Sequence, residues 1–168
     1  AFAQTALAVG CHVTVVDGSP VLPPAEVPSL IDPKDPASGQ FRAGVGTFAA
    51  DLVRGRIREA EIEAEAAAQI RRIQSSGLRV THVDTHKHTH VFRQVLLPLI
   101  RAASACGVPA MRNPFEPLWS MRAAPGKSTL RLLALHALRA RRGFFIRRVR
   151  KSGNATTDGA IGLLATGN

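Results

Sequence analysis

Residues 81–90 read Thr-His-Val-Asp-Thr-His-Lys-His-Thr-His, so one short stretch holds four of the six histidines of the chain together with an aspartate. Neutral imidazole is the commonest metal ligand among protein side chains, and a neighbouring aspartate can hold such a ring in the tautomer that binds metal. In an extended segment, alternation would place the rings of His86, His88 and His90 on one side. The stretch therefore predicts a metal site, with a set of hydrogen-bonded structural histidines as the alternative.

The elements around this stretch indicate where it lies. The apolar run Leu78–Asp84 predicts a strand, and α/β enzymes place catalytic groups directly after such strands. Val9–Val16 predicts another strand, which the turn Asp17-Gly18 ends. The segment Ser19–Gln40 is rich in proline and long enough to be a functional loop or lid.

The remaining periodic segments complete an alternating order of strands and helices. They are a helix over Thr47–Ser76 stopped by Gly77, a helix over Phe92–Ala105, a strand over Val108–Arg112, and a helix over Lys127–Arg142 stopped by Gly143. This order predicts an α/β fold with mainly parallel strands, as in part of a barrel. The chain fits one domain, residues 1–168.

Two histidines stand apart from the cluster. His12 is isolated in the first strand, and His136 lies on the apolar helix Leu130–Leu138. Local pattern alone predicts a structural role for both.

The charge is strongly positive and uneven. Lys and Arg number 22 against 12 Asp and Glu, a net charge of +10, and the excess is densest in Arg139–Lys151. A solvated helix face, an anionic membrane and nucleic acid are the three interpretations. Nucleic acid is the weaker functional one, because only Phe144 and Phe145 interrupt the arginines and could stack on bases.

No apolar run is long enough to cross a membrane, and the first residues lack the pattern of a signal peptide. Cys11 and Cys106 are far apart in the sequence, which favours a reducing compartment over a disulfide scaffold. We therefore expect a soluble, cytoplasmic protein, with the basic stretch as the candidate contact to a membrane. A homodimer is left open.

Residues 81–90 resemble the T-H-x-D-[ST]-H-x-H-x-H segment of YdjC-like carbohydrate deacetylases, and residues 9–15 resemble their G-x-H-[LVF]-x-L strand. Residues 18–24, 112–117 and 157–167 are similar to the branch of that family associated with hopanoid biosynthesis. The resemblance covers nearly the whole chain.

The resemblance implies a distorted (β/α) barrel and a divalent metal, Mg²⁺ or Zn²⁺, held by one aspartate and two histidines. The two histidines correspond to His12 and His86, so that His12 becomes a ligand. The other implied site residues are His88, His90 and Arg112, which line the pocket or hold the acetyl oxygen, and Asp84 and His82, which support the ligands. The implied substrate is an acetylated aminosugar or glycolipid.

The chain departs from the family pattern in two places. The family begins with an N-A-D-D-[FW]-G segment, whose carboxylates act as metal ligand and general base, and it carries a late C-H-P segment. This chain has neither. We therefore expect a fragment whose barrel is incomplete at both ends and whose own turnover is slow or absent. A metal- or polyanion-binding module without catalytic activity is the alternative function.

Overall fold

The computed structural model describes residues 7–117, 119–120 and 138–160. Its core is a four-stranded parallel sheet in the order β1-β2-β3-β4. The strands are β1 (Val9–Val13), β2 (Val80–Thr85), β3 (Ala110–Met111) and β4 (Ala155–Thr156). The expected α/β fold with a parallel sheet is therefore confirmed. Neighbouring strands in the sheet are also successive along the chain.

The helices are α1 (Val45–Val53), α2 (Glu59–Gln74), α3 (Arg93–Ala105) and α6 (Arg142–Lys151). Short 3-10 helices span Pro24–Glu26, Pro36–Ser38 and His86–Val91. Among the described residues, no helix is both long enough and apolar enough to cross a membrane.

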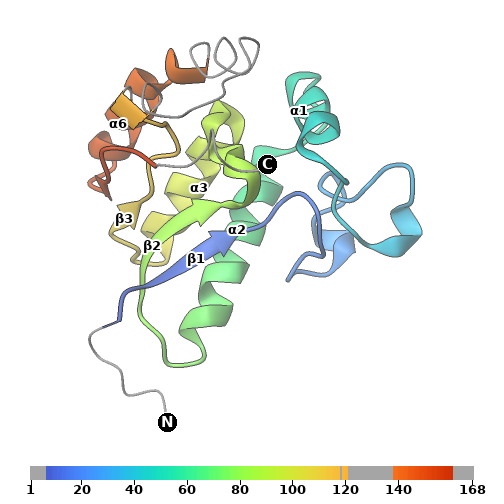
Figure 1. Ribbon diagram of the computed structural model, residues 1–168. Coiled ribbons are helices and arrows are strands. Elements are labelled where there is room, and N and C mark those ends of the chain that lie inside the picture. Colours follow the sequence, from blue (N-terminus) through green and yellow to red (C-terminus); the bar gives the residue numbers. More distant parts are fainter. Residues whose placement is uncertain (1–6, 118, 121–137, 161–168) are drawn as a thin grey trace.

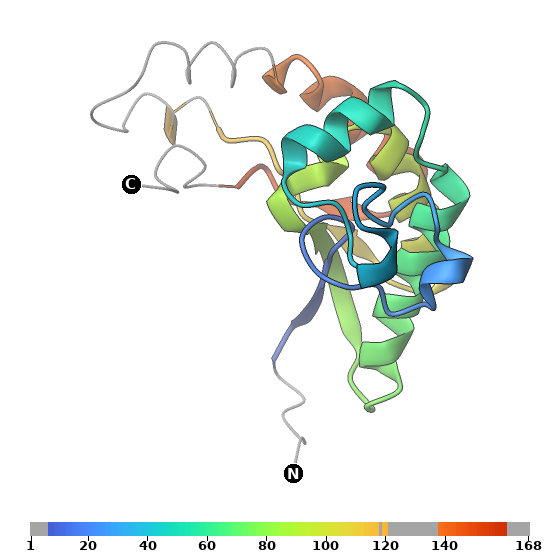
Figure 2. The same cartoon turned by 90° about the vertical axis from the view of Figure 1, so that its right-hand side faces the viewer.

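The helices α2 and α3 lie behind the sheet in Figure 1, and the side view in Figure 2 shows them together on one side of it. Cys11, Val13 and Val83 point into this layer and are at most 2% exposed. The intervening positions, including His12 and Asp84, face the opposite side. Burial of apolar area between sheet and helices thus fixes which side chains of β1 and β2 remain open to solvent.

Several expected elements differ from those observed. The single helix expected over Thr47–Ser76 is wrong: Gly55 has a φ of 70°, which ends α1 and lets the chain turn into α2. Gly143 does not stop a helix either, because it lies inside α6. Most of the helix expected over Lys127–Arg142, including His136, lies outside the described residues. The strands are shorter than expected or, for β4, were not expected.

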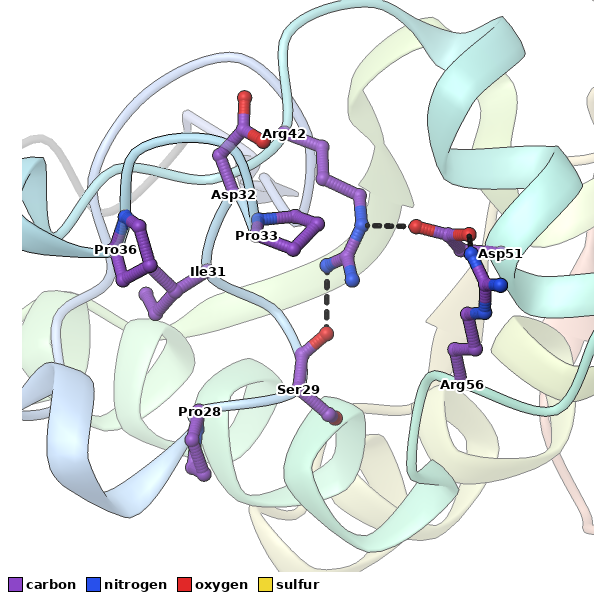
Figure 3. A pocket seen from close by; sticks show the side chains of 9 residues that line it. All are labelled: Pro28, Ser29, Ile31, Asp32, Pro33, Pro36, Arg42, Asp51 and Arg56. Atoms are coloured by element: carbon purple, nitrogen blue, oxygen red, sulfur yellow. Dashed lines mark hydrogen bonds and ion pairs between the residues drawn. The ribbon is translucent and has the colours of Figure 1, made fainter.

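The proline-rich segment is held against α1 and α2 by buried polar groups. The Arg42 side chain is 4% exposed and donates from Nε to Asp51 Oδ2 at 2.9 Å and from Nη1 to the Ser29 carbonyl at 2.6 Å. Figure 3 shows these contacts in the wall of a cavity of about 490 Å³, which Arg56 and several prolines also line. Glu65, fully buried in α2, accepts hydrogen bonds from the backbone N–H groups of Val21 and Leu22.

Candidate metal and catalytic site

His12 and Asp84 face each other across the first two strands. They are register partners in β1 and β2, and His12 Nδ1 lies 2.7 Å from Asp84 Oδ1. Because an ionised carboxylate only accepts hydrogen bonds, the proton of His12 belongs on Nδ1. The Nε2 atom of His12 therefore keeps its lone pair, and the His12 side chain is 54% exposed on the open face of the sheet.

His86 follows β2 and brings a second imidazole to the same place. Its Nδ1 atom lies 3.3 Å from His12 Nε2, and the two rings meet edge to face. The residues are 74 positions apart, so the parallel pairing of β1 and β2 brings them together. A proton on His86 Nδ1 or a shared cation can fill the space between the two nitrogens.

His12 Nε2 and His86 Nδ1 have the spacing of two ligands of one metal ion. Ligand nitrogens at 2.0–2.1 Å from a tetrahedral zinc ion stand about 3.3 Å apart, and a carboxylate behind a ligand histidine is the usual support. Within the part of the chain that the structure describes, however, no three His, Cys, Asp or Glu side chains gather in an arrangement that could hold a metal. His12 and His86 therefore supply two ligands of an incomplete set.

Asp17, which the sequence indicated only as a turn residue, is next to this pair. It has a φ of 55°, its Oδ1 accepts the Gly44 N–H at 2.7 Å, and its Oδ2 lies 2.6 Å from Lys87 Nζ and 3.8 Å from His86 Nε2. The hydrogen bond from Lys87 holds the pKa of Asp17 below its ordinary value. Its place four residues after β1, at the edge where His86 follows β2, was the signal that could have identified it.

His88 lies on a strained turn beside the pair. Lys87 and His88 both have positive φ angles, 50° and 53°, so residues 86–91 form an irregular 3-10 helix. The expected alternation of His86, His88 and His90 along an extended segment is therefore wrong. Burial lowers the pKa of His88, and its Nδ1 atom is buried without a hydrogen-bond partner among the described residues.

His90 lies in the core below the site. It is fully buried, its Nδ1 pairs with Thr85 Oγ1 at 2.5 Å, and its Nε2 lies 3.1 Å from the Arg112 carbonyl. This burial lowers the pKa of His90 to about 4, so the ring is neutral at pH 7. Both nitrogens are occupied, which fits support of the turn; a catalytic role for His90 stays a prediction.

Arg112 and His82 complete the expected set. Arg112 Nη1 lies 3.3 Å from Asp84 Oδ2, so Asp84 contacts both Arg112 and His12. The ring of His82 packs on Gly10, where a Cβ atom would come within 2.3 Å of its Nε2, and its Nδ1 lies 3.0 Å from Thr81 Oγ1. The structure thus brings His12, Asp84, His86 and Arg112 into one cluster, while the position of His82 is set by Gly10.

Several known proteins are similar to this chain. A carbohydrate deacetylase of Brevibacillus brevis is 37% identical over 103 residues, which cover 61% of this chain and 37% of that protein. A carbohydrate deacetylase of Halalkalibacterium halodurans is 32% identical over 111 residues, which cover 64% of this chain and 44% of that protein. This chain therefore spans less than half the length of these relatives.

A crystal structure from Enterococcus faecalis V583, of a protein described as a candidate for cellobiose-phosphate cleavage, has a similar fold. It superposes with a TM-score of 0.58 at 22% identity over 90% of this chain and 46% of that one. The family model described as YdjC-like protein matches residues 1–168. With this match over its full length, the chain belongs to the YdjC-like protein family.

Proposed function

We propose that the protein acts as a metal-dependent carbohydrate deacetylase that hydrolyses the N-acetyl group of an aminosugar. The observation that carries this proposal is the meeting of His12 Nε2 and His86 Nδ1 at 3.3 Å, with Asp84 behind His12. The names of the curated relatives support the same reaction class.

The side chains have distinct tasks in this scheme. His12 and His86 hold a divalent ion, Zn²⁺ or Mg²⁺, which when bound supplies a water of lowered pKa and polarises the acetyl carbonyl. Asp84 keeps the Nδ1 proton on His12, so that Nε2 always faces the ion. Arg112, 48% exposed beside Asp84, can donate a hydrogen bond to the acetyl oxygen or a sugar hydroxyl. In this proposal His88 borders the substrate, as the family resemblance implies.

We further propose that the sheet belongs to a distorted (β/α) barrel. Parallel sheets are normally covered on both faces, but α2 and α3 cover only one face of this sheet. A cavity of about 590 Å³ lies on the open face beside His82 and Arg112, and one of about 600 Å³ runs along β1 beside His12. Additional strands and side chains of a barrel would fill both spaces.

The finer substrate proposal is an acetylated aminosugar on a lipid of the hopanoid type. It is supported by the resemblance of residues 18–24, 112–117 and 157–167 to the hopanoid-associated branch. Acetate release from a lipid-linked substrate at a lower KM than from the free sugar would support it.

The alternative function is a metal-binding module without catalysis, since two convergent histidines bind metal whether or not a reaction follows. Acetate release by the full-length protein decides between the two. Release that requires the metal supports the deacetylase, whereas metal binding without release from any N-acetylated sugar supports the module.

Isothermal calorimetry with Zn²⁺ and with Mg²⁺ tests the site itself. We expect His12→Ala and His86→Ala each to weaken binding at least tenfold, because each removes one of two ligands. Asp35→Ala is the control, as it removes an exposed acidic side chain in the proline-rich segment and should leave the affinity unchanged. Affinity that is unchanged by His12→Ala would reduce the site to a local histidine cluster and contradict the proposal.

A further inference from the structure

The segment Leu138–Ser152 carries a concentrated positive charge. It contains seven Lys and Arg residues and no Asp or Glu. Ten of its residues form α6, so helical spacing decides which of these charges share a face. The segment is therefore a basic helix with its preceding turn, and its outer face carries charge of one sign.

The α6 helix has a clear inner and outer face. Phe145 and Val149 are buried, at 1% and 0% exposure, whereas Arg147, Arg148 and Lys151 are exposed. No ion pair joins these three cations to an acidic side chain in the part of the chain that the structure describes. Their charge is thus available to an external partner.

Arginine side chains near α6 pack on aromatic rings, and this bears on whether a membrane or a nucleic acid is the partner. The guanidinium of Arg148 lies 5.2 Å from the centre of the Phe144 ring, and that of Arg141 lies 5.7 Å from the centre of the Phe92 ring. Single-stranded nucleic acid needs aromatic faces on which bases can stack. Because arginines cover these two faces, the arrangement favours a charged surface over a stacked nucleic acid.

The chain segment that carries Trp119 is tied to the basic segment. Trp119 is 63% exposed and follows Glu116 by three residues. The carbonyl of Glu116 accepts a hydrogen bond from Arg139 Nη1 at 2.8 Å. Exposed tryptophan is enriched at the boundary between lipid and water, where the indole sits among the headgroups.

A small hollow also opens between α3 and α6. It has a volume of about 240 Å³ and is lined by Leu97, Ile100, Arg101, Arg148, Lys151 and Ser152. Arg101 is paired with Glu59 and Glu63. Leu97 and Ile100 beside the two remaining cations, Arg148 and Lys151, fit a phosphate headgroup with the start of its acyl chains.

We propose that the outer face of α6, together with Trp119, is a docking surface for a membrane that contains anionic lipids. The inner face of the same helix packs against the core below the candidate site, where the Phe145 ring lies 5.9 Å from that of His90. The surface does not depend on the proposed deacetylase reaction, and it would hold the protein next to lipid-borne substrates.

The chain carries its own probe for this surface. It has a single tryptophan and no tyrosine, so its intrinsic fluorescence reports Trp119. With vesicles of phosphatidylcholine that contain about 30% phosphatidylglycerol, we expect a blue shift of the Trp119 emission and co-sedimentation of the protein. Vesicles of phosphatidylcholine alone should give neither.

Two triple charge-reversal variants test whether the membrane binds at α6. Each cation near an anionic membrane contributes roughly fivefold to partitioning, so Arg147→Glu/Arg148→Glu/Lys151→Glu should lower it by on the order of 100-fold or more. The matched control, Lys34→Glu/Arg71→Glu/Arg79→Glu, changes the net charge equally at exposed positions away from α6 and should bind nearly as the unaltered chain does. Circular dichroism checks that both variants fold.

Three results would overturn the proposal. Equal loss in the two triple variants would assign the binding to net charge, and an unshifted Trp119 emission with anionic vesicles would remove the tryptophan from the surface. Binding of a single-stranded oligonucleotide through Arg147, Arg148 and Lys151, without vesicle binding, would assign the surface to nucleic acid.

Discussion

Asp84 is the residue on which the geometry of the candidate site depends. One oxygen holds His12 in the tautomer that presents Nε2, and the other faces the guanidinium of Arg112. A carboxylate shared in this way joins three residues from three successive strand ends. The site is therefore assembled by side-chain contacts across the edge of the sheet rather than by the histidine-rich stretch alone.

His90 gives a residue-scale prediction about pH. Its pKa is about 4 in the folded chain against an ordinary 6.5, because burial disfavours the charged ring. The folded state therefore binds fewer protons than the unfolded state between these two values, and stability falls as the pH falls from about 6.5 to 4. The difference in pKa corresponds to about 3 kcal/mol, present above pH 6.5 and lost by pH 4.

Urea unfolding at a series of pH values measures this loss, with His90→Gln as the comparison. Glutamine keeps hydrogen-bonding groups for Thr85 and Arg112 but does not titrate in this range. We expect the advantage of the unaltered chain over the variant to shrink as the pH falls through this window. A constant difference would mean that His90 is not held neutral by its surroundings.

At the scale of elements, the ion pair of Arg42 and Asp51 connects the proline-rich segment to α1, as Figure 3 shows. Asp51→Asn leaves the buried guanidinium without its counter-charge, which should cost on the order of 3 kcal/mol in the free energy of unfolding. Asp35→Asn, at an exposed loop position, is the control and should change it little. Chemical denaturation measures both variants.

The Asp51→Asn substitution should also affect Asp17 in the candidate site, through a backbone hydrogen bond. The Arg42 carbonyl accepts the Asp17 N–H at 3.0 Å, and Asp17 in turn pairs with Lys87. We therefore expect amide hydrogen exchange at residues 17 and 42–44 to speed up in Asp51→Asn before that of β2 does. Exchange that accelerates equally everywhere would mean that the segment and the sheet open as one unit.

Sequence patterns located β1, β2, β3 and α3, because each combines an apolar run with a clear turn or glycine at its end. The predicted helix boundaries were wrong at two glycines, because a glycine can either end a helix or lie within it. Gly55 lies in a region of alanine and acidic residues that reads as a continuous helix, yet its positive φ ends α1. Gly143 reads as a stop, yet α6 continues through it because Phe145 and Val149 are buried on its inner face.

The candidate site was predictable only in part, because some of its contacts join residues that are far apart in the sequence. The density of histidines indicated His86 and Asp84, but His12 alone looks like any isolated histidine and was assigned through family resemblance. Its partnership with Asp84 depends on the register between strands 72 residues apart, which no local pattern encodes. Asp17 was missed because Asp-Gly after a strand is also an ordinary turn sequence.

At the scale of the whole molecule, the net charge of +10 lets salt separate the two proposed sites. Attraction between α6 and an anionic membrane acts through solvent and is screened, since the Debye length falls from about 10 Å at 0.1 M salt to about 3 Å at 1 M. Ligand bonds from His12 and His86 to a metal act at contact and are not screened in this way. The two binding reactions should therefore respond differently to the same change in ionic strength.

We expect vesicle partitioning to fall more than tenfold between about 0.1 and 0.5 M sodium chloride, while zinc affinity changes by less than about threefold. Co-sedimentation and calorimetry on the same protein preparation measure the two quantities. A parallel decline would show that exposed carboxylates, whose attraction for zinc is screened by salt, bind the ion rather than the two imidazoles. Vesicle binding that persists at high salt would instead place most of its free energy in apolar contacts such as that of Trp119, and the cations of α6 would then serve to orient the protein on the membrane.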